Sequence, residues 1–100
     1  MMRMNVQFAE KVIRIRLEGR LAEQWAEELQ KLAVRAIGSR GPDANIEVNL
    51  TEVSHLDSRG EEVLKWLSRL GARFVAESAS SQWLCERIGL LYELPSKKIV

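Results

Sequence analysis

The spacing of apolar residues changes at one short turn, and this change restricts the possible folds more than any other feature of the chain. Before the turn, apolar and polar residues alternate over 46–50, which predicts a β-strand. After it, apolar residues recur at helical spacing and predict a helix over 60–70: Val63, Leu64, Leu67 and Leu70. The turn is Asp57-Ser58-Arg59-Gly60, so a serine lies at the positive end of a helix dipole. Such a position suits a phosphate, a carboxylate of a partner protein, or a helix cap.

The N-terminal half adds two strands and the longest helix. Two alternating runs, 4–8 and 13–17, are separated by a short polar interval and predict a β-hairpin. A helix is predicted over 22–37, with Gly38 as its stop, because apolar residues fall on one stripe: Trp25, Leu29, Leu32 and Ala36. For the same reason we expect Trp25 to belong to the core.

The C-terminal part continues the alternation of strands and helices. A strand is predicted over 73–77 and a helix over 80–88 that Ser80 or Ser81 caps, and a last edge strand is expected over 97–100. Strands that alternate with helices predict parallel pairings with crossover helices. Because the N-terminal hairpin is antiparallel, the sheet should be mixed.

Length, charge and cysteine content narrow the class of protein. One hundred residues are expected to form one domain over 1–100. A net charge of +1 gives no electrostatic reason to expect nucleic acid as a partner. No apolar run approaches the roughly 20 residues of a membrane-spanning helix, so we expect no direct membrane insertion. The single cysteine, Cys85, is expected to be a small buried hydrophobe, and the missing disulfide framework and leader predict a cytoplasmic location.

The sequence motifs of common catalytic sites are missing from the chain. There is no glycine-rich phosphate loop, H-E-x-x-H, C-x-x-C or nucleophile elbow. His55 precedes Asp57 and Ser58, but near neighbours in a turn point in different directions, whereas a catalytic triad must converge on one reacting atom. We therefore expect no enzyme activity, no cofactor and no metal site.

Three segments together resemble the STAS family, the domain of sulfate transporters and anti-sigma factor antagonists, over roughly residues 4–95. They are Leu17-Glu18-Gly19-Arg20-Leu21, the strand at 46–50 with the following Leu56-Asp57-Ser58-Arg59-Gly60, and the closing segment from Leu84 to Leu90. The resemblance implies an α/β fold with a mixed four- to five-stranded sheet and about three to four helices packed against it. It also implies a function that is exercised by binding other proteins.

In the antagonist branch of this family, a partner anti-sigma kinase phosphorylates the serine directly after the aspartate, which here is Ser58. The unphosphorylated antagonist binds the anti-sigma factor and frees sigma, and the phosphate breaks that complex by adding negative charge. The resemblance therefore implies a phosphoprotein of bacterial signalling that regulates transcription. Its partner-binding residues would be Asp57, Ser58, Arg59, Gly60 and Glu61.

The sequence departs from the family pattern near this turn, and these departures leave a second hypothesis for the function open. Ala22 stands where an acidic residue is common, and Glu61-Glu62 replaces a small or apolar pair. Ser58 and Glu61 also fit a capping box, in which the serine is a structural cap instead of a phosphorylation site. The alternative function is a non-phosphorylated STAS scaffold, or an accessory subunit of a membrane transporter or signalling assembly.

Two further tryptophans are candidates for a protein interface. Trp66 and Trp83 each flank the apolar stripe of a predicted helix, so each is either a core residue or a partly exposed aromatic anchor.

Overall fold

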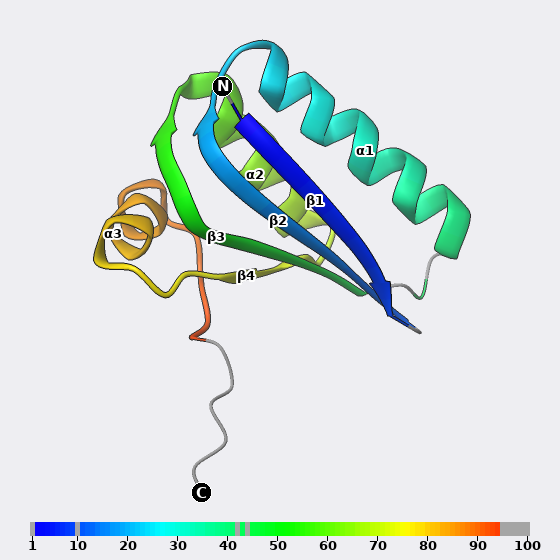
Figure 1. Cartoon of the computed structure of the whole chain (residues 1–100). Helices are drawn as coiled ribbons and strands as arrows, with labels where there is room; N and C mark the ends of the chain where they lie inside the picture. Colours follow the sequence, from blue (N-terminus) through cyan, green and yellow to red (C-terminus); the bar gives the residue numbers. More distant parts are fainter. Residues whose placement is uncertain (1, 10, 42, 44, 95–100) are drawn as a thin grey trace, which may run out of the picture.

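The computed structural model describes residues 2–9, 11–41, 43 and 45–94 (Figure 1). Their elements follow the predicted order, two strands and then alternating helices and strands. The strands are β1 (Met2–Ala9), β2 (Val12–Leu21), β3 (Asn45–Leu56) and β4 (Arg73–Val75). The helices are α1 (Gln24–Arg40), α2 (Ser58–Arg69) and α3 (Ala79–Ile88). The strand expected over 97–100 lies outside the described residues.

The four strands form one mixed sheet in the order β1-β2-β3-β4. β1 pairs with β2 antiparallel, whereas β3 is parallel to both β2 and β4. This sheet and its three helices confirm the predicted α/β fold class. None of the described helices is long and apolar enough to cross a membrane.

β3 is longer than the predicted strand over 46–50, because it continues to Leu56, the residue before the Asp57 turn. Burial alternates along β3 only as far as Leu50; beyond it, the next buried residues are Val53 and Leu56. In this part the pairing register between β2 and β3 shifts twice. Such irregularities break the two-residue alternation of a strand. The alternating pattern in the sequence therefore stops at Leu50, although the strand continues to Leu56.

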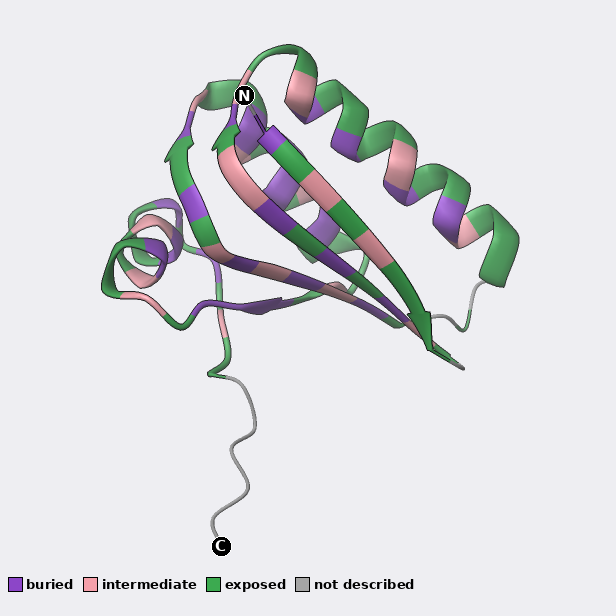
Figure 2. Cartoon of the chain, viewed as in Figure 1, coloured by how far each residue is buried: buried purple, intermediate pink, exposed green. Residues whose placement is uncertain are grey.

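α1 and α2 pack on one face of the sheet, α3 lies beside β3, and one core joins them (Figure 2). Completely buried residues of β2 and β3 point to this face, among them Ile13, Leu17 and Val48. Leu29 of α1 and Leu67 of α2 are fully buried against them, as the stripes predicted. The opposite face of the sheet carries polar side chains, including the exposed Arg14 and Arg16.

The predicted stripe of α1 is rotated relative to the face that is buried. Its buried residues are Ala26, Leu29, Ala33 and Ala36. Trp25 and Leu32 are only half-buried at the margin, so the prediction that Trp25 lies in the core holds only in part. Small alanine side chains let a helix approach the sheet closely, whereas the sequence pattern gave more weight to the large apolar residues.

The predicted ends of two helices were also wrong. α1 continues through Gly38 to Arg40, and Gly41 follows as its C-cap, with a φ of 90° and an N–H that donates to the Ile37 carbonyl. α3 is capped by Ser78, not by Ser80 or Ser81. The Ser78 hydroxyl accepts from the Ser81 N–H at 3.1 Å, and Ser81 itself is a buried residue of the first turn.

The one cysteine lies in the core, as predicted. Cys85 of α3 is 1% exposed, and burial raises the pKa of its thiol to about 11. A thiol in this state is inert, because the thiolate is the reactive form.

Candidate functional site

Two strand-to-helix turns meet at the carboxyl ends of β2 and β3, and the predicted site residues lie in one of them (Figure 1). β2 and β3 are parallel neighbours, and Leu21 at the end of one pairs with Leu56 at the end of the other. The turns that follow therefore begin side by side. The Asp57 N–H donates to the Leu21 carbonyl at 3.4 Å and connects them.

The Asp57 carboxylate joins the starts of α1 and α2. Its Oδ1 accepts from the Gly60 N–H at 2.8 Å, which makes Asp57 the N-cap of α2. Its Oδ2 accepts from the Glu23 N–H at 2.9 Å, directly before α1. The hydrogen bond from Gly60 is the main reason why the pKa of Asp57 lies below its ordinary value, and the bond from Glu23 adds to it, while partial burial opposes both. Asp57 therefore carries a negative charge at neutral pH.

Glu23 has an unusual backbone conformation at this junction. Its φ is 52°, and among the described residues it is the one non-glycine residue with a positive φ. The Trp25 N–H donates to the Ala22 carbonyl at 3.0 Å and closes a tight turn around it. A strained conformation of this kind persists only where surrounding contacts hold it. The hydrogen bond from the Glu23 N–H to Asp57 is such a contact.

Position 60 requires glycine, because the neighbouring atoms leave no room for a β-carbon. A β-carbon on Gly60 would overlap the Leu21 carbonyl oxygen and come within 2.9 Å of Leu56 Cδ1. The residue is buried in the first turn of α2, where the helix backbone passes directly over the end of β2. The glycine therefore sets how closely α2 approaches the sheet and holds the Asp57 turn in place.

Ser58 and Arg59 form the exposed part of the turn. Ser58 is the first residue of α2, and its hydroxyl has no hydrogen-bond partner among the described residues. The predicted capping box of Ser58 and Glu61 is wrong, because Asp57 supplies the cap one residue earlier. Glu61 instead pairs with Lys65 at 3.4 Å, one helical turn further along α2.

An ion pair connects the exposed surface of this turn to α1. The Arg59 guanidinium lies 3.3 Å from the Glu27 carboxylate, and both side chains are more than half exposed. The Asp57 turn is thus tied to the start of α1 by two contacts, one from Asp57 and one from Arg59. Of the five site residues predicted, Asp57 and Gly60 hold the backbone, whereas Ser58 and Arg59 face solvent and Glu61 is half-buried.

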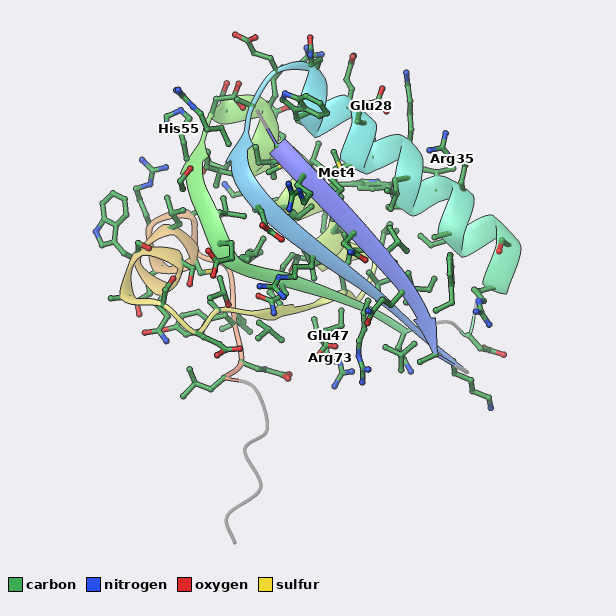
Figure 3. The ribbon with its side chains drawn as sticks, in the orientation of Figure 1. Met4, Glu28, Arg35, Glu47, His55 and Arg73 are labelled. Atoms are coloured by element: carbon green, nitrogen blue, oxygen red, sulfur yellow. The ribbon has the colours of Figure 1, made fainter. Side chains whose placement is uncertain are left out.

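Other candidate residues lie outside this cluster. His55 is exposed and lies on β3, before the turn (Figure 3). Trp66 is half-buried against the core, whereas Trp83 on α3 is 59% exposed and stacks with the Arg87 guanidinium at 5.1 Å. In the described part of the chain, no three His, Cys, Asp or Glu side chains gather as a metal site would require.

Sequence reasoning missed Glu23, directly before α1, and Glu27 in its first turn, which both contact the Asp57 turn. The predicted parallel order gave a usable signal, since the carboxyl ends of neighbouring parallel strands lie at the same edge of a sheet. The individual contacts could not be predicted from the sequence, because the residues that make them are far apart in the chain: Glu23 and Asp57 are separated by 34 positions.

Solved structures with the same fold share little sequence with this chain. An anti-sigma factor antagonist from Mycobacterium paratuberculosis matches with a TM-score of 0.77 at 16% identity, over 96% of this chain and 87% of its own. The anti-sigma factor antagonist SpoIIAA in its unphosphorylated form matches with a TM-score of 0.69 at 17% identity, over 94% and 90%. An uncharacterized protein from Shewanella loihica with a SpoIIAA-like fold gives 0.58 at 13% identity, over 86% and 75%.

These likenesses show the fold. The chain has the SpoIIAA-like fold of anti-sigma factor antagonists, which confirms at this level the STAS resemblance found in the sequence. A scan against models of protein families gave no match, and a search of curated protein sequences gave no significant match.

Proposed function

We propose that this chain is a single-domain cytoplasmic regulator that binds an anti-sigma factor through the Asp57 turn, and that phosphorylation of Ser58 releases it. The chain itself carries out no catalysis in this proposal, since the kinase activity belongs to the partner. The fold shared with two anti-sigma factor antagonists supports the proposal.

The position of Ser58 is the observation that carries the proposal. Ser58 is exposed at the first position of α2, and its hydroxyl has no hydrogen-bond partner among the described residues. A kinase could therefore reach this oxygen without breaking the cap of the helix, because Asp57 makes that cap. A structural serine cap would have been unavailable for modification while the helix was intact.

The fixed backbone of the turn suits it to a binding surface. Asp57 anchors the turn to two helix starts, and Gly60 places α2 close against the end of β2. Side chains on such a preorganised segment lose little entropy on binding. The exposed residues Ser58 and Arg59 would then contact the partner directly.

A phosphate at Ser58 would enter a surface that is already acidic. Asp57 is ionised beside it, and Glu61 and Glu62 follow on α2. The phosphate adds about 1.5 to 2 negative charges at neutral pH. Arg59 is the nearest cation in sequence and is paired with Glu27, so the phosphate would compete for that ion pair and repel acidic groups of the partner.

The test uses the full chain and an anti-sigma factor kinase from the same source cell. With ATP, the kinase should phosphorylate wild type and not Ser58→Ala, and mass spectrometry should place the phosphate on Ser58. Ser58→Asp should weaken binding to the kinase by about tenfold or more, which corresponds to ~1.4 kcal/mol. Ser68 is exposed near the other end of α2, so Ser68→Asp is the matched control and should bind like wild type.

The second candidate function is a constitutive scaffold or an accessory subunit of a membrane transporter. The observation in its favour is that Arg59 and Lys65, two cations of α2, are each paired with a glutamate of the chain, which leaves less positive charge free to hold a phosphate. Co-purification of transporter components with a chain that stays unmodified in cells and tolerates Ser58→Asp would select this function. It would refute the phosphorylation switch.

A further inference from the structure

The outer edge of β1 has the features of a sheet edge with which another strand can pair. β1 is the last strand of the sheet on its side, and its eight residues pair with β2 in a continuous register from Met2 to Ala9. The strand has no bulge in this register and no proline, and Arg3 is its one charged residue. Natural sheets usually blunt such edges with prolines, bulges, charges or a covering segment. An edge of this length and regularity is suited to pairing with another strand.

The sequence of β1 is complementary to itself in an antiparallel arrangement. If a second β1 ran antiparallel with Asn5 opposite Asn5, Met4 would face Val6 and Arg3 would face Gln7. From Met2 to Phe8, each apolar residue would then meet an apolar residue on one face, and each polar residue a polar one on the other. Cross-strand neighbours of matching type are the contacts that stabilise a sheet.

An apolar groove follows this edge. It has a volume of about 310 Å³ and is lined by Val6, Phe8, Leu32, Arg35, Ala36 and Ser39. Phe8 remains 49% exposed in it, although the Arg40 guanidinium lies 4.7 Å from its ring. The groove therefore joins the β1 edge to the flank of α1, and both would be covered by one partner.

The flank of α1 carries charges that are complementary to themselves. Glu28, Leu32, Arg35 and Ser39 are spaced four, three and four residues apart, which places them on one side of the helix. Glu28 and Arg35 are exposed on α1 (Figure 3), and in the sequence they stand four residues before and three residues after Leu32. A second α1 running antiparallel, with Leu32 opposite Leu32, would place Glu28 of each copy beside Arg35 of the other.

A single two-fold axis can relate both the two β1 strands and the two α1 helices of such a pair. β1 spans eight residues and α1 spans 17, so their lengths are about 26 Å and about 25 Å. Both run beside each other in the same direction (Figure 1). Asn5 lies near the middle of β1 and Leu32 in the middle of α1. Leu32 also lines the same groove as Val6, the residue after Asn5, so an axis perpendicular to the sheet at Asn5 passes close to Leu32.

We infer that this chain forms a symmetric dimer in which two β1 edges pair antiparallel about Asn5 and two α1 helices pack across the same axis. The partner is a second copy of the chain, because the same surface complements itself in apolar pattern, polar pattern and charge. The two four-stranded sheets become one continuous sheet. The inference does not depend on the proposed function, since it uses the β1 edge and not the Ser58 turn.

The first experiment is a disulfide cross-link across the axis. Asn5→Cys should give a covalent dimer under mild oxidation, because directly opposed residues of antiparallel strands lie within disulfide range. Gln7→Cys is the matched control, since Gln7 is also exposed on β1 but would lie opposite Arg3, too far from its own copy. The native Cys85 is buried and should not cross-link.

The second experiment reverses charge on α1 and measures mass by light scattering over micromolar to millimolar protein. Glu28→Arg and Arg35→Glu should each weaken dimerisation by about tenfold or more, because each places like charges together twice. The double variant Glu28→Arg/Arg35→Glu restores opposite charges and should dimerise like wild type. Glu62→Arg, an exposed reversal on α2, should change nothing.

Three results would overturn the inference. The wild-type chain could remain a monomer over the whole concentration range. Asn5→Cys and Gln7→Cys could cross-link equally well, which would indicate random collision. A dimer could persist unchanged in both single charge reversals, which would place its interface elsewhere on the molecule.

Discussion

Replacing Gly60 with alanine tests whether the close approach of α2 to β2 holds the site together. Within a helix, glycine to alanine normally stabilises by up to about 1 kcal/mol, since alanine has the higher helix propensity. At Gly60 the added methyl group would overlap the Leu21 carbonyl oxygen and press on Leu56 Cδ1 at 2.9 Å. The first contact is with backbone, which cannot move aside as a flexible side chain can. The start of α2 must therefore shift away from β2.

The expected loss follows from the contacts that this shift breaks. Overpacking of a tight site costs about 1–3 kcal/mol, and the helix cap by Asp57 contributes ~1 kcal/mol. After the gain in helix propensity is subtracted, we expect Gly60→Ala to lower the free energy of unfolding by about 1–3 kcal/mol. In urea denaturation this appears as a midpoint lower by about 0.5–1.5 M.

Gly38 provides a matched control for the same substitution. It lies in α1, is exposed, and has no atom within 4 Å of where its β-carbon would stand. Gly38→Ala should therefore raise the free energy of unfolding by up to about 1 kcal/mol. If Gly60→Ala were as stable as wild type while Gly38→Ala gained stability, the steric reasoning about the turn would be refuted.

Three further predictions concern the Asp57 junction and the core. Folding lowers the pKa of Asp57 below its ordinary 3.8, so the stabilisation by its carboxylate is complete above the unfolded-state pKa and is lost as the pH falls through the lower folded-state pKa. Asp57→Asn should therefore make the free energy of unfolding fall less steeply at acid pH. An unchanged dependence on pH in this range would contradict the role of Asp57. Glu23→Gly should raise the melting temperature and stabilise by about 1 kcal/mol, since glycine tolerates the positive φ, whereas Glu23→Ala should bring no such gain. Leu29→Ala and Leu67→Ala should each cost about 2–5 kcal/mol in urea denaturation, because both side chains are fully buried, and near-wild-type midpoints would contradict their place in the core.

Local periodicity was sufficient to predict the order of elements in this chain. The two-residue period of Ile13, Ile15 and Leu17 and the helical period of Val63, Leu64 and Leu67 are properties of consecutive residues, so they are readable without the fold. The parallel pairing of β2 with β3 followed from the helix between them, because a crossover is needed to return the chain in the same direction. The resemblance that led to Ser58 also rested on short local motifs.

The tertiary structure decided the features that depend on contact between distant segments. Asp57 and Ser58 are both residue types that cap helices well, so the sequence alone does not decide between them; in the structure Asp57 is the cap, and the Glu23 N–H binds its other oxygen. The buried face of α1 was set by how closely its alanines fit against the sheet, which no single helix pattern contains. Gly60 is needed because of the Leu21 carbonyl, 39 positions earlier in the chain. Such constraints arise from distances across the fold, and a sequence records residue types and spacing along the chain but not those distances.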